Sequence, residues 1–306
     1  MMSGAPHEPV GAHWEDMSDP TPDPAPSLQH VTATLRAAGC VYAEDEAHLL
    51  LAAARTADEL STLLARRVAG EPLELVVGWA ELAGARVALA PGVFVPRQRT
   101  RLLVEQAAAR ARPGSVVLDL CCGTGAVGLA VALAVPGVEL HASDLDPDAV
   151  ACARLNVEGS GGTGGTGGTG GAGGAGGTAG TDRSGTVYEG DLFDALPDSL
   201  RGRVDVLVVN APYVPTDAVP LMPAEARVHE HLLALDGGSD GLEVQRRVAQ
   251  RAGEWLARRG YLVIETSERQ GPATVALLAD AGLAARVVRS EDLDATVVVA
   301  SRGLAA

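Results

Sequence analysis

The chain has 306 residues, a formal net charge of −15 and a pI near 4.8. This length is sufficient for one large or two modest domains, each with its own apolar core. Such an acidic surface repels phosphate backbones, so we expect no direct nucleic-acid partner. The start of the chain shows no signal region, and no apolar run reaches the length of a membrane span. We therefore expect a cytoplasmic protein that does not bind membranes.

Residues 1–27 are rich in proline and acidic residues without periodicity, which predicts a disordered tail. Three helical patterns follow, near Leu28–Ala38, from Glu44 and from Ala57. Together they predict a small helical N-terminal domain over residues 28–72.

Apolar residues alternate over Leu73–Leu89, which predicts a β-hairpin and makes residues 73–97 a linker. A helix is expected next, over Thr100–Ala111. The arginines at 97, 99 and 101 are close in sequence but form only a weak basic patch.

From Ser115 onward strands and helices alternate, the pattern of a doubly wound α/β sheet with helices on both faces. The expected strands are Val116–Leu120, Val138–Ala142, Thr186–Asp191, Val204–Val209 and Tyr261–Glu265, then Ala285–Arg289 and Ala295–Ala300 as an antiparallel pair. The expected helices are Ala126–Ala134, Pro147–Val157, Gly241–Ala257 and Pro272–Ala281.

Residues 159–180 are almost entirely glycine, threonine and alanine, a composition that cannot bury enough surface to fold. Because the cost of closing a loop grows slowly with its length, a fold tolerates such an insertion. We expect a flexible insertion within a single domain over residues 98–306.

Four cysteines lie at positions 40, 121, 122 and 152. Their spacing matches no zinc-binding pattern, so we expect free thiols in a reducing compartment and no metal site.

The strongest local motif runs from Val116 to Gly125, Val-Val-Leu-Asp-Leu-Cys-Cys-Gly-Thr-Gly. Its last two glycines and Gly128 match G-x-G-x-x-G, and Asp144 follows about 20 residues later at the end of a strand. This spacing fits a dinucleotide or S-adenosylmethionine equally well, because a carboxylate binds the ribose hydroxyls of either.

Two further acids favour S-adenosylmethionine. Asp119 lies just before the turn, where it would attract the ammonium group of the methionine part and repel a pyrophosphate. Asp191 ends the third strand, where an adenine amino group could lie. For either acid the alternative is a structural carboxylate that accepts backbone N–H groups. The motif therefore indicates a class I methyltransferase core.

A second motif, Asn-Ala-Pro-Tyr at Asn210–Tyr213, follows the apolar strand Val204–Val209. Pro212 holds Ala211 in an extended conformation, and ligands of open α/β sheets bind at the carboxyl ends of the strands. We expect the chemistry here, although asparagine and proline are also common in ordinary turns.

With both motifs in one sheet, the chain resembles the protein glutamine N5-methyltransferases of the HemK/PrmC type, which modify the Gly-Gly-Gln glutamine of peptide-chain release factors. The resemblance extends from about Leu28 to the C-terminus. It is carried by Arg67–Leu73, Pro91–Arg97, Asp119–Gly125, Asn210–Tyr213, Leu235–Leu242, and Ile264 and Glu265 with Gln270. The chain departs from the family pattern in three places: Ala211 replaces a proline, Arg99 and Arg101 replace acids, and the glycine-rich insertion is additional.

The resemblance implies N5-methylation of a protein glutamine with S-adenosylmethionine as cofactor and a release factor as the protein substrate. The implied catalytic residues are Asn210, Ala211, Pro212 and Tyr213: the Asn210 side-chain oxygen and the Ala211 carbonyl accept the amide hydrogens, and Tyr213 packs against the amide. The implied cofactor-binding residues are Asp119, Cys121, Gly123, Thr124, Gly125, Asp144, Leu145, Asp191, Leu192 and Asn210. His229, Glu230 and His231, after this motif, are expected to be polar residues of a surface loop.

Other functions remain open at this point. The acceptor could be another protein glutamine or an adenine amino group, and a non-catalytic binding protein or a nicotinamide dehydrogenase could share the fold. By analogy with the family, the helical N-terminal domain is the candidate docking site for the substrate, and we expect a monomer.

Overall fold

The structure, a computed structural model, describes residues 26–159 and 185–302. The predicted tail before Pro26 and the predicted insertion after Gly159 lie outside these residues. The contacts between residues divide the chain into two units, Met1–Leu64 and Ala65–Ala306, and each is described separately.

The first unit is helical, as predicted. It contains α1 (Leu28–Ala37), α2 (Ala43–Ala53) and most of α3 (Ala57–Val68). Ser27 caps α1 by accepting a hydrogen bond from the backbone N–H of His30. Helices α1 and α2 pack against each other, and Leu35 and Leu50 are fully buried.

The second unit begins with a short helix, α4 (Leu73–Val77), where the alternating pattern predicts a strand. The prediction is wrong for these five residues, because Pro72 at the N-cap starts a helical turn and Gly78, in a left-handed conformation, ends it. The hairpin itself is limited to β1 (Trp79–Leu82) and β2 (Ala85–Ala88).

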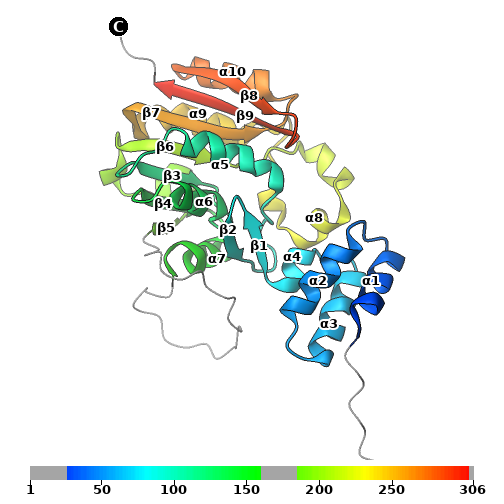
Figure 1. Cartoon of the computed structure of the whole chain (residues 1–306). Coiled ribbons are helices and arrows are strands. Elements are labelled where there is room, and N and C mark those ends of the chain that lie inside the picture. Colours follow the sequence, from blue (N-terminus) through cyan, green and yellow to red (C-terminus); the bar gives the residue numbers. More distant parts are fainter. Residues whose placement is uncertain (1–25, 160–184, 303–306) are drawn as a thin grey trace, which may run out of the picture. The chain divides into compact units, whose positions relative to one another are not determined.

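A seven-stranded sheet of order β5-β4-β3-β6-β7-β9-β8 forms the centre of the second unit (Figure 1). Its strands are β3 (Val116–Leu120), β4 (Glu139–Asp144), β5 (Gly185–Glu189), β6 (Val204–Val209), β7 (Leu256–Thr266), β8 (Leu283–Ser290) and β9 (Ala295–Arg302). Strand β9 runs antiparallel to both of its neighbours, and the remaining pairs are parallel. The predicted doubly wound sheet with a final antiparallel pair is confirmed.

Two layers of helices cover this sheet. Helices α5 (Arg101–Ala108), α6 (Ala126–Ala134) and α7 (Pro147–Val157) lie on one face, and α9 (Glu243–Trp255) and α10 (Gly271–Asp280) lie on the other. Along β3 the side chains alternate between the two cores, so that Val117 contacts the first layer and Leu118 the second. Among residues 26–159 and 185–302 the remaining helical segments of the second unit are α8 (Ala224–His229) and the 3₁₀ turns Gln98–Thr100, Leu192–Ala195, Asp198–Leu200, Thr216–Leu221 and Leu232–Ala234.

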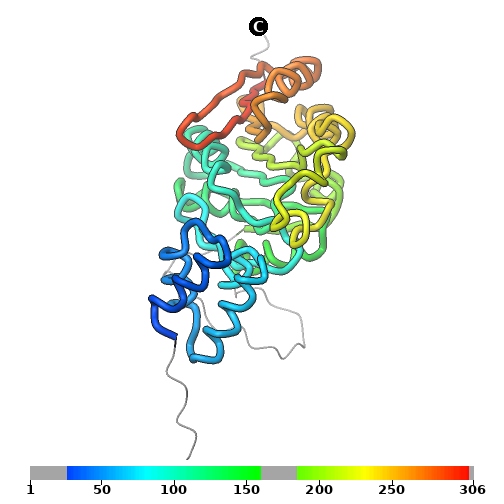
Figure 2. The backbone as a smooth tube through the Cα atoms, turned by 90° about the vertical axis from the view of Figure 1, so that its right-hand side faces the viewer, coloured from blue at the N-terminus to red at the C-terminus, as the bar shows by residue number. Residues whose placement is uncertain are grey.

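The order of the strands reverses between β3 and β6. From β3 the chain continues to β4 on one side, and from β6 it continues to β7 on the other, which leaves a crevice at the carboxyl ends of both strands. The segment between β6 and α9, yellow in Figures 1 and 2, lies beside the chain that follows β2, and a β-bridge joins Gly92 to Glu230. No helix in the described part of the chain is long and apolar enough to cross a membrane.

Asn156 of α7 joins three segments by buried hydrogen bonds. Its Nδ2 donates to the carbonyl oxygens of Ala88 (3.0 Å) and Thr124 (2.9 Å), and its Oδ1 accepts from the backbone N–H of Ala88 (2.8 Å). The end of the hairpin is thereby attached to the glycine-rich turn after β3.

We predict that Asn156→Ala lowers the free energy of unfolding by about 3 kcal/mol, because it leaves buried backbone groups without partners. Leu155→Ala, at a neighbouring position whose side chain is exposed, should change it by less than about 0.5 kcal/mol. Chemical denaturation of the two variants measures the difference, and equal losses of stability would contradict the role given to Asn156.

Candidate functional site

A pocket opens at the carboxyl ends of β3, β4 and β6. All of the predicted site residues except Asp119 and Gly125 line it: Cys121, Gly123, Thr124, Asp144, Leu145, Asp191, Leu192, Asn210, Ala211, Pro212 and Tyr213. The two motifs, far apart in the sequence, therefore contribute to one cavity.

The glycine-rich turn is held against the end of β4. The backbone N–H of Gly123 donates to Asp144 Oδ2 (2.8 Å), and that of Cys122 donates to the carbonyl oxygen of Ser143 (3.1 Å). Asp144 Oδ1 accepts from the N–H of Asp146 (3.0 Å). Each carboxylate oxygen can accept a second hydrogen bond, so Asp144 can still bind ribose hydroxyls.

The pocket contains polar groups suited to a ligand. Thr124 Oγ1 and Ser143 Oγ are buried and have no hydrogen-bond partner among the described residues, which is uncommon for buried polar atoms. A Cβ added at Gly123 would meet no protein atom within 4 Å, so the space beside this glycine is open. Asp144 and Asp146 lie at the same end of the pocket. A cationic sulfonium ligand fits this acidic wall.

Two lining residues hold unusual backbone conformations. Cys121 (φ 56°) and Leu192 (φ 48°) are in the left-handed region, which side chains other than glycine rarely adopt. Such strain is concentrated at ligand-binding sites. Burial raises the pKa of the Cys121 thiol well above its usual value, which favours the neutral thiol. Cys121, Cys122 and Cys152 form no disulfide bond within the described residues.

Asp119 lies behind the wall of the pocket rather than in it. Its side chain is buried, and Oδ2 accepts a hydrogen bond from the backbone N–H of Gly128 in α6 (2.8 Å). Burial, and to a smaller extent the charge of Asp144, raise the pKa of Asp119 to about 7. This geometry agrees with the alternative considered from the sequence, an acid that accepts a backbone N–H.

Asp191 is paired with a residue that the sequence did not single out. Arg247 of α9 donates to Asp191 Oδ2 (2.6 Å), and both residues line the pocket. The charge of the Asp191 carboxylate is thus balanced by Arg247, and its second oxygen can accept a hydrogen bond from a ligand.

The acceptor motif begins directly after β6. Asn210 Nδ2 lies 3.5 Å from Thr100 Oγ1, and no hydrogen bond reaches Asn210 Oδ1 within residues 26–159 and 185–302. The hydroxyl of Tyr213 donates to Glu265 Oε1 (3.2 Å). Burial, followed by the charge of Glu265, raises the pKa of Tyr213, so the residue stays a neutral phenol.

Glu265 is a second buried acid at this end of the pocket. Its Oε2 has no hydrogen-bond partner in the described part of the chain, and burial raises the pKa of its carboxyl. Arg99 Nε lies 3.7 Å from Glu265 Oε1, and the Arg99 side chain is 49% exposed.

Gln270 holds the loop that follows the acceptor motif. Its Nε2 donates to the carbonyl oxygens of Tyr213 and Asp240, each at 3.0 Å. The sequence identified Gln270 and Leu235–Leu242 only as parts of the resemblance, without roles. The structure gives them one, because together they fix the course of the chain after Tyr213.

The prediction of a surface loop around Glu230 holds for His231 but is wrong for His229, which ends α8, and for Glu230 itself. This residue is buried, forms an ion pair with Arg97 and accepts from the N–H of Val95 (3.3 Å). Contacts with the distant segment after β2 decide its burial, and the local sequence contains no sign of them.

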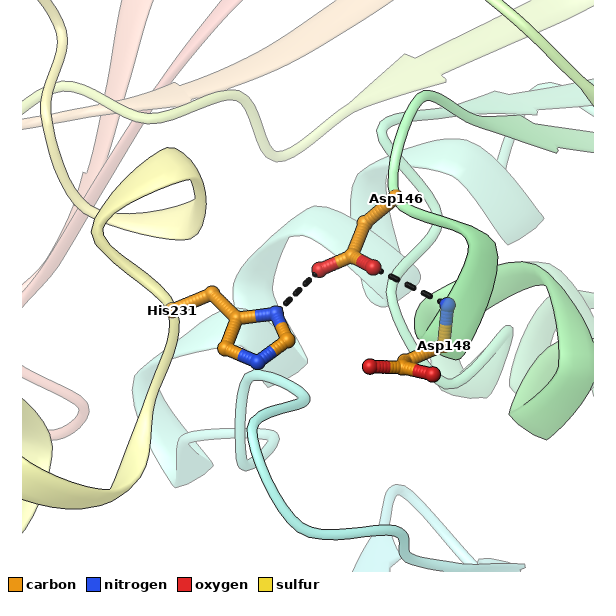
Figure 3. Close-up of side chains that lie close together, drawn as sticks. All are labelled: Asp146, Asp148 and His231. Carbon is orange, nitrogen blue, oxygen red and sulfur yellow. Dashed lines mark hydrogen bonds and ion pairs between the residues drawn. The ribbon is translucent and has the colours of Figure 1, made fainter.

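His231 is attached to the edge of the pocket. Its Nδ1 lies 2.6 Å from Asp146 Oδ2, and the other oxygen of Asp146 accepts from the N–H of Asp148 (2.9 Å), as Figure 3 shows. The hydrogen bond with Asp146 raises the pKa of His231. The potential ligand atoms of these three side chains lie within 4.8 Å of one another. The pair joins the segment after α8 to the start of α7.

Comparison with known proteins agrees with this geometry. The family model described as Methyltransferase small domain matches residues 85–166. The crystal structure of a methyltransferase from Pyrococcus furiosus superposes with a TM-score of 0.50 at 14% identity, over 72% of this chain and 90% of that chain, and so shares the fold.

Two relatives known from curated sequences are closer in sequence. A release factor glutamine methyltransferase from Geobacter sulfurreducens is 32% identical over 72% of this chain and 69% of its own length. A 4-amino-L-phenylalanine/4-methylamino-L-phenylalanine methyltransferase from Streptomyces pristinaespiralis is 31% identical over 87% of this chain and 90% of its own length.

The sheet, the glycine-rich turn and the pocket at the strand reversal define a class I S-adenosylmethionine-dependent methyltransferase. The identity to the Geobacter enzyme extends over more than two thirds of both chains. The chain belongs to the release factor glutamine methyltransferase family.

We predict that Asp119→Asn changes how stability depends on pH. The folded-state pKa of about 7 lies above the ordinary value of 3.8. The stability that protonated Asp119 contributes is therefore lost progressively as the pH rises from 3.8 to about 7. The neutral variant escapes this loss, so its unfolding free energy relative to wild type should rise by up to about 1.4 kcal/mol per pH unit until about pH 7 and stay level above it. Denaturation between about pH 5 and pH 8 tests this, and parallel curves would refute it.

We also predict that Gly241→Ala disrupts the acceptor loop. Gly241 has φ +73°, and a Cβ there would lie 2.3 Å from the Tyr213 carbonyl oxygen and 2.4 Å from Gln270 Nε2. Methyl transfer should fall by at least about tenfold, equivalent to roughly 1.4 kcal/mol in the barrier, while affinity for S-adenosylhomocysteine is retained.

Gly202→Ala is the matched control, because Gly202 has φ +69° and no atom within 4 Å of the added Cβ. It has the same backbone strain without the collision. Steady-state kinetics and calorimetry compare the two variants, and equal losses of activity would show that strain alone is responsible.

Proposed function

We propose that this protein transfers a methyl group from S-adenosylmethionine to the side-chain amide nitrogen of a protein glutamine, the Gly-Gly-Gln glutamine of a peptide-chain release factor. The main support is that Asn210–Tyr213 and the glycine-rich turn line the same pocket. Membership of the release factor glutamine methyltransferase family supports the choice of substrate. We propose further that the protein acts in the cytoplasm as a monomer.

An amide nitrogen is a poor nucleophile, because its lone pair is delocalised into the carbonyl group. The bound cofactor supplies an electrophilic sulfonium methyl, so the protein mainly has to align the nitrogen. In this proposal Asn210 Oδ1 and the Ala211 carbonyl oxygen accept the two amide hydrogens, and they stabilise the positive charge that develops on the nitrogen as it gains the methyl group. The nitrogen then releases one of these two protons to water, which restores a neutral amide. Because Ala211 contributes a backbone atom, the absence of the family's proline there does not remove this acceptor.

The cofactor end of the pocket is assigned in the same way. Asp144 accepts hydrogen bonds from the ribose hydroxyls, Thr124 and Ser143 offer their unpaired hydroxyl groups, and Asp191 lies where the adenine amino group would bind. Asp119 contributes indirectly, by holding the start of α6 and hence the glycine-rich turn.

We predict that Asn210→Ala lowers methyl transfer to a release factor by at least about tenfold, the effect of losing one good hydrogen bond of roughly 1.4 kcal/mol. Affinity for S-adenosylhomocysteine should stay nearly unchanged. Single-turnover kinetics with labelled cofactor, together with calorimetry, measure both quantities. Unchanged turnover would show that Asn210 does not hold the acceptor.

The substrate is tested by offering labelled S-adenosylmethionine with the host's release factors and its DNA side by side. Label on a release factor that disappears when the Gly-Gly-Gln glutamine is replaced supports the proposal. Label on DNA would favour an adenine amino group instead.

A second candidate acceptor is the amino group of a free amino acid. The relative from Streptomyces pristinaespiralis, whose name describes methylation of 4-amino-L-phenylalanine, matches a larger share of both chains than the Geobacter enzyme does. Adding 4-amino-L-phenylalanine to the same labelling experiment separates the two candidates.

A further inference from the structure

The acceptor end of the pocket contains a basic side chain to which the proposed mechanism assigns no task. Two arginines line the pocket, Arg99 and Arg247. Arg247 is committed to Asp191 by a hydrogen bond of 2.6 Å at the cofactor end. Arg99 lies at the other end, with its Cζ 6.0 Å from the centre of the Tyr213 ring.

The guanidinium of Arg99 is half-exposed and forms an ion pair with the buried Glu265. Its Nε lies 3.7 Å from Glu265 Oε1, which exceeds hydrogen-bonding distance, and the side chain is 49% exposed. Glu265 already accepts from the Tyr213 hydroxyl. Within residues 26–159 and 185–302 the ion pair reaches Arg99 through Nε, and the two terminal nitrogens form no hydrogen bond, so their planar fork can bind a pair of ligand oxygens.

The position of Arg99 connects it to the acceptor. The next residue, Thr100, is buried and places its Oγ1 3.5 Å from Asn210 Nδ2. A charge on Arg99 thus lies beside the acceptor motif and not at the reacting nitrogen. A guanidinium in such a place binds carboxylates in a bidentate manner, with defined geometry.

From this geometry we propose that Arg99 is a specificity residue that binds a carboxylate of the acceptor substrate beside the acceptor motif. The proposal rests on the methyl transfer proposed above and narrows its substrate class. The carboxylate has two possible sources, an acidic side chain next to the glutamine of a protein or the α-carboxylate of a free amino acid.

Substitution of Arg99 would have a different effect on acceptor binding if the residue had only a structural role. If the residue served only to neutralise Glu265, its loss would disturb the pocket for every acceptor alike. A carboxylate-binding Arg99 instead changes the ratio between acidic and neutral acceptors, which is the quantity to measure.

The experiment measures binding to the full chain loaded with S-adenosylhomocysteine, using two matched pairs of probes. One pair is a Gly-Gly-Gln peptide flanked by aspartate and the same peptide flanked by asparagine. The other is 4-amino-L-phenylalanine and its carboxamide. We expect the wild-type protein to bind the acid at least about tenfold more tightly than its neutral partner in one pair, as one charge-assisted hydrogen bond allows.

In Arg99→Gln this preference should disappear while the affinity for the neutral probe stays within about twofold, a change of roughly 0.4 kcal/mol. Arg99→Lys should restore part of it, because the charge returns without the fork. Arg101→Gln is the matched control: Arg101 is exposed, pairs with Glu105 and does not line the pocket. It should keep the full preference.

The proposal is overturned if the wild-type protein binds the acidic probe no more tightly than the neutral probe in both pairs. It is also overturned if Arg99→Gln keeps the preference for the acidic probe, or if it loses affinity for the acidic and the neutral probe equally. Methyl transfer with the same probes separates this result from the proposed function. Peptides methylated regardless of their flanking residue would leave the proposed function standing without the role of Arg99. If no peptide is methylated and the preference for 4-amino-L-phenylalanine depends on Arg99, the role of Arg99 stands and the proposed methylation of a protein glutamine fails.

Discussion

The parallel pairing of β3 with β6 is the constraint on which the site depends. It aligns Leu120 with Val209, so that the turn beginning at Cys121 and the motif beginning at Asn210 leave the sheet side by side. The contacts between the two motifs depend on this register, since a slip of one residue would turn the side chains of β6 to the opposite face of the sheet. The buried valines and leucines of the two strands keep that register by filling two different cores.

The sequence predicts the parts of the fold that local pattern determines. The bounds of Val116–Leu120, Ala126–Ala134, Pro147–Val157 and Val204–Val209 agree with the structure, because apolar runs and helix starts carry their own signals. The misassigned helix at Leu73–Val77 shows the limit, since its short apolar sequence fits a strand as well as a helix and only the flanking Pro72 and Gly78 mark it as helical.

Within the site, sequence motifs identify most residues that line the pocket but miss Thr100 and Ser143, which line it as well. Thr100 and Asn156 act through partners far along the chain, and nothing in their neighbourhood distinguishes them from ordinary polar residues. Asp119 shows the converse, because its sequence position fits a ligand contact while the fold turns its carboxyl toward Gly128. Which neighbour a strand-end acid meets depends on the packing of the following helix.

The arrangement of β8 at the edge of the sheet has a consequence for how the molecule meets copies of itself. An edge strand presents free backbone groups that can template cross-molecular pairing. Here Arg286 and Arg289 lie on that strand and are exposed, and Arg289 pairs with Glu268. A strand added by another molecule would have to desolvate these guanidinium groups. The edge is therefore protected against aggregation by the same charges that keep this end of the sheet soluble.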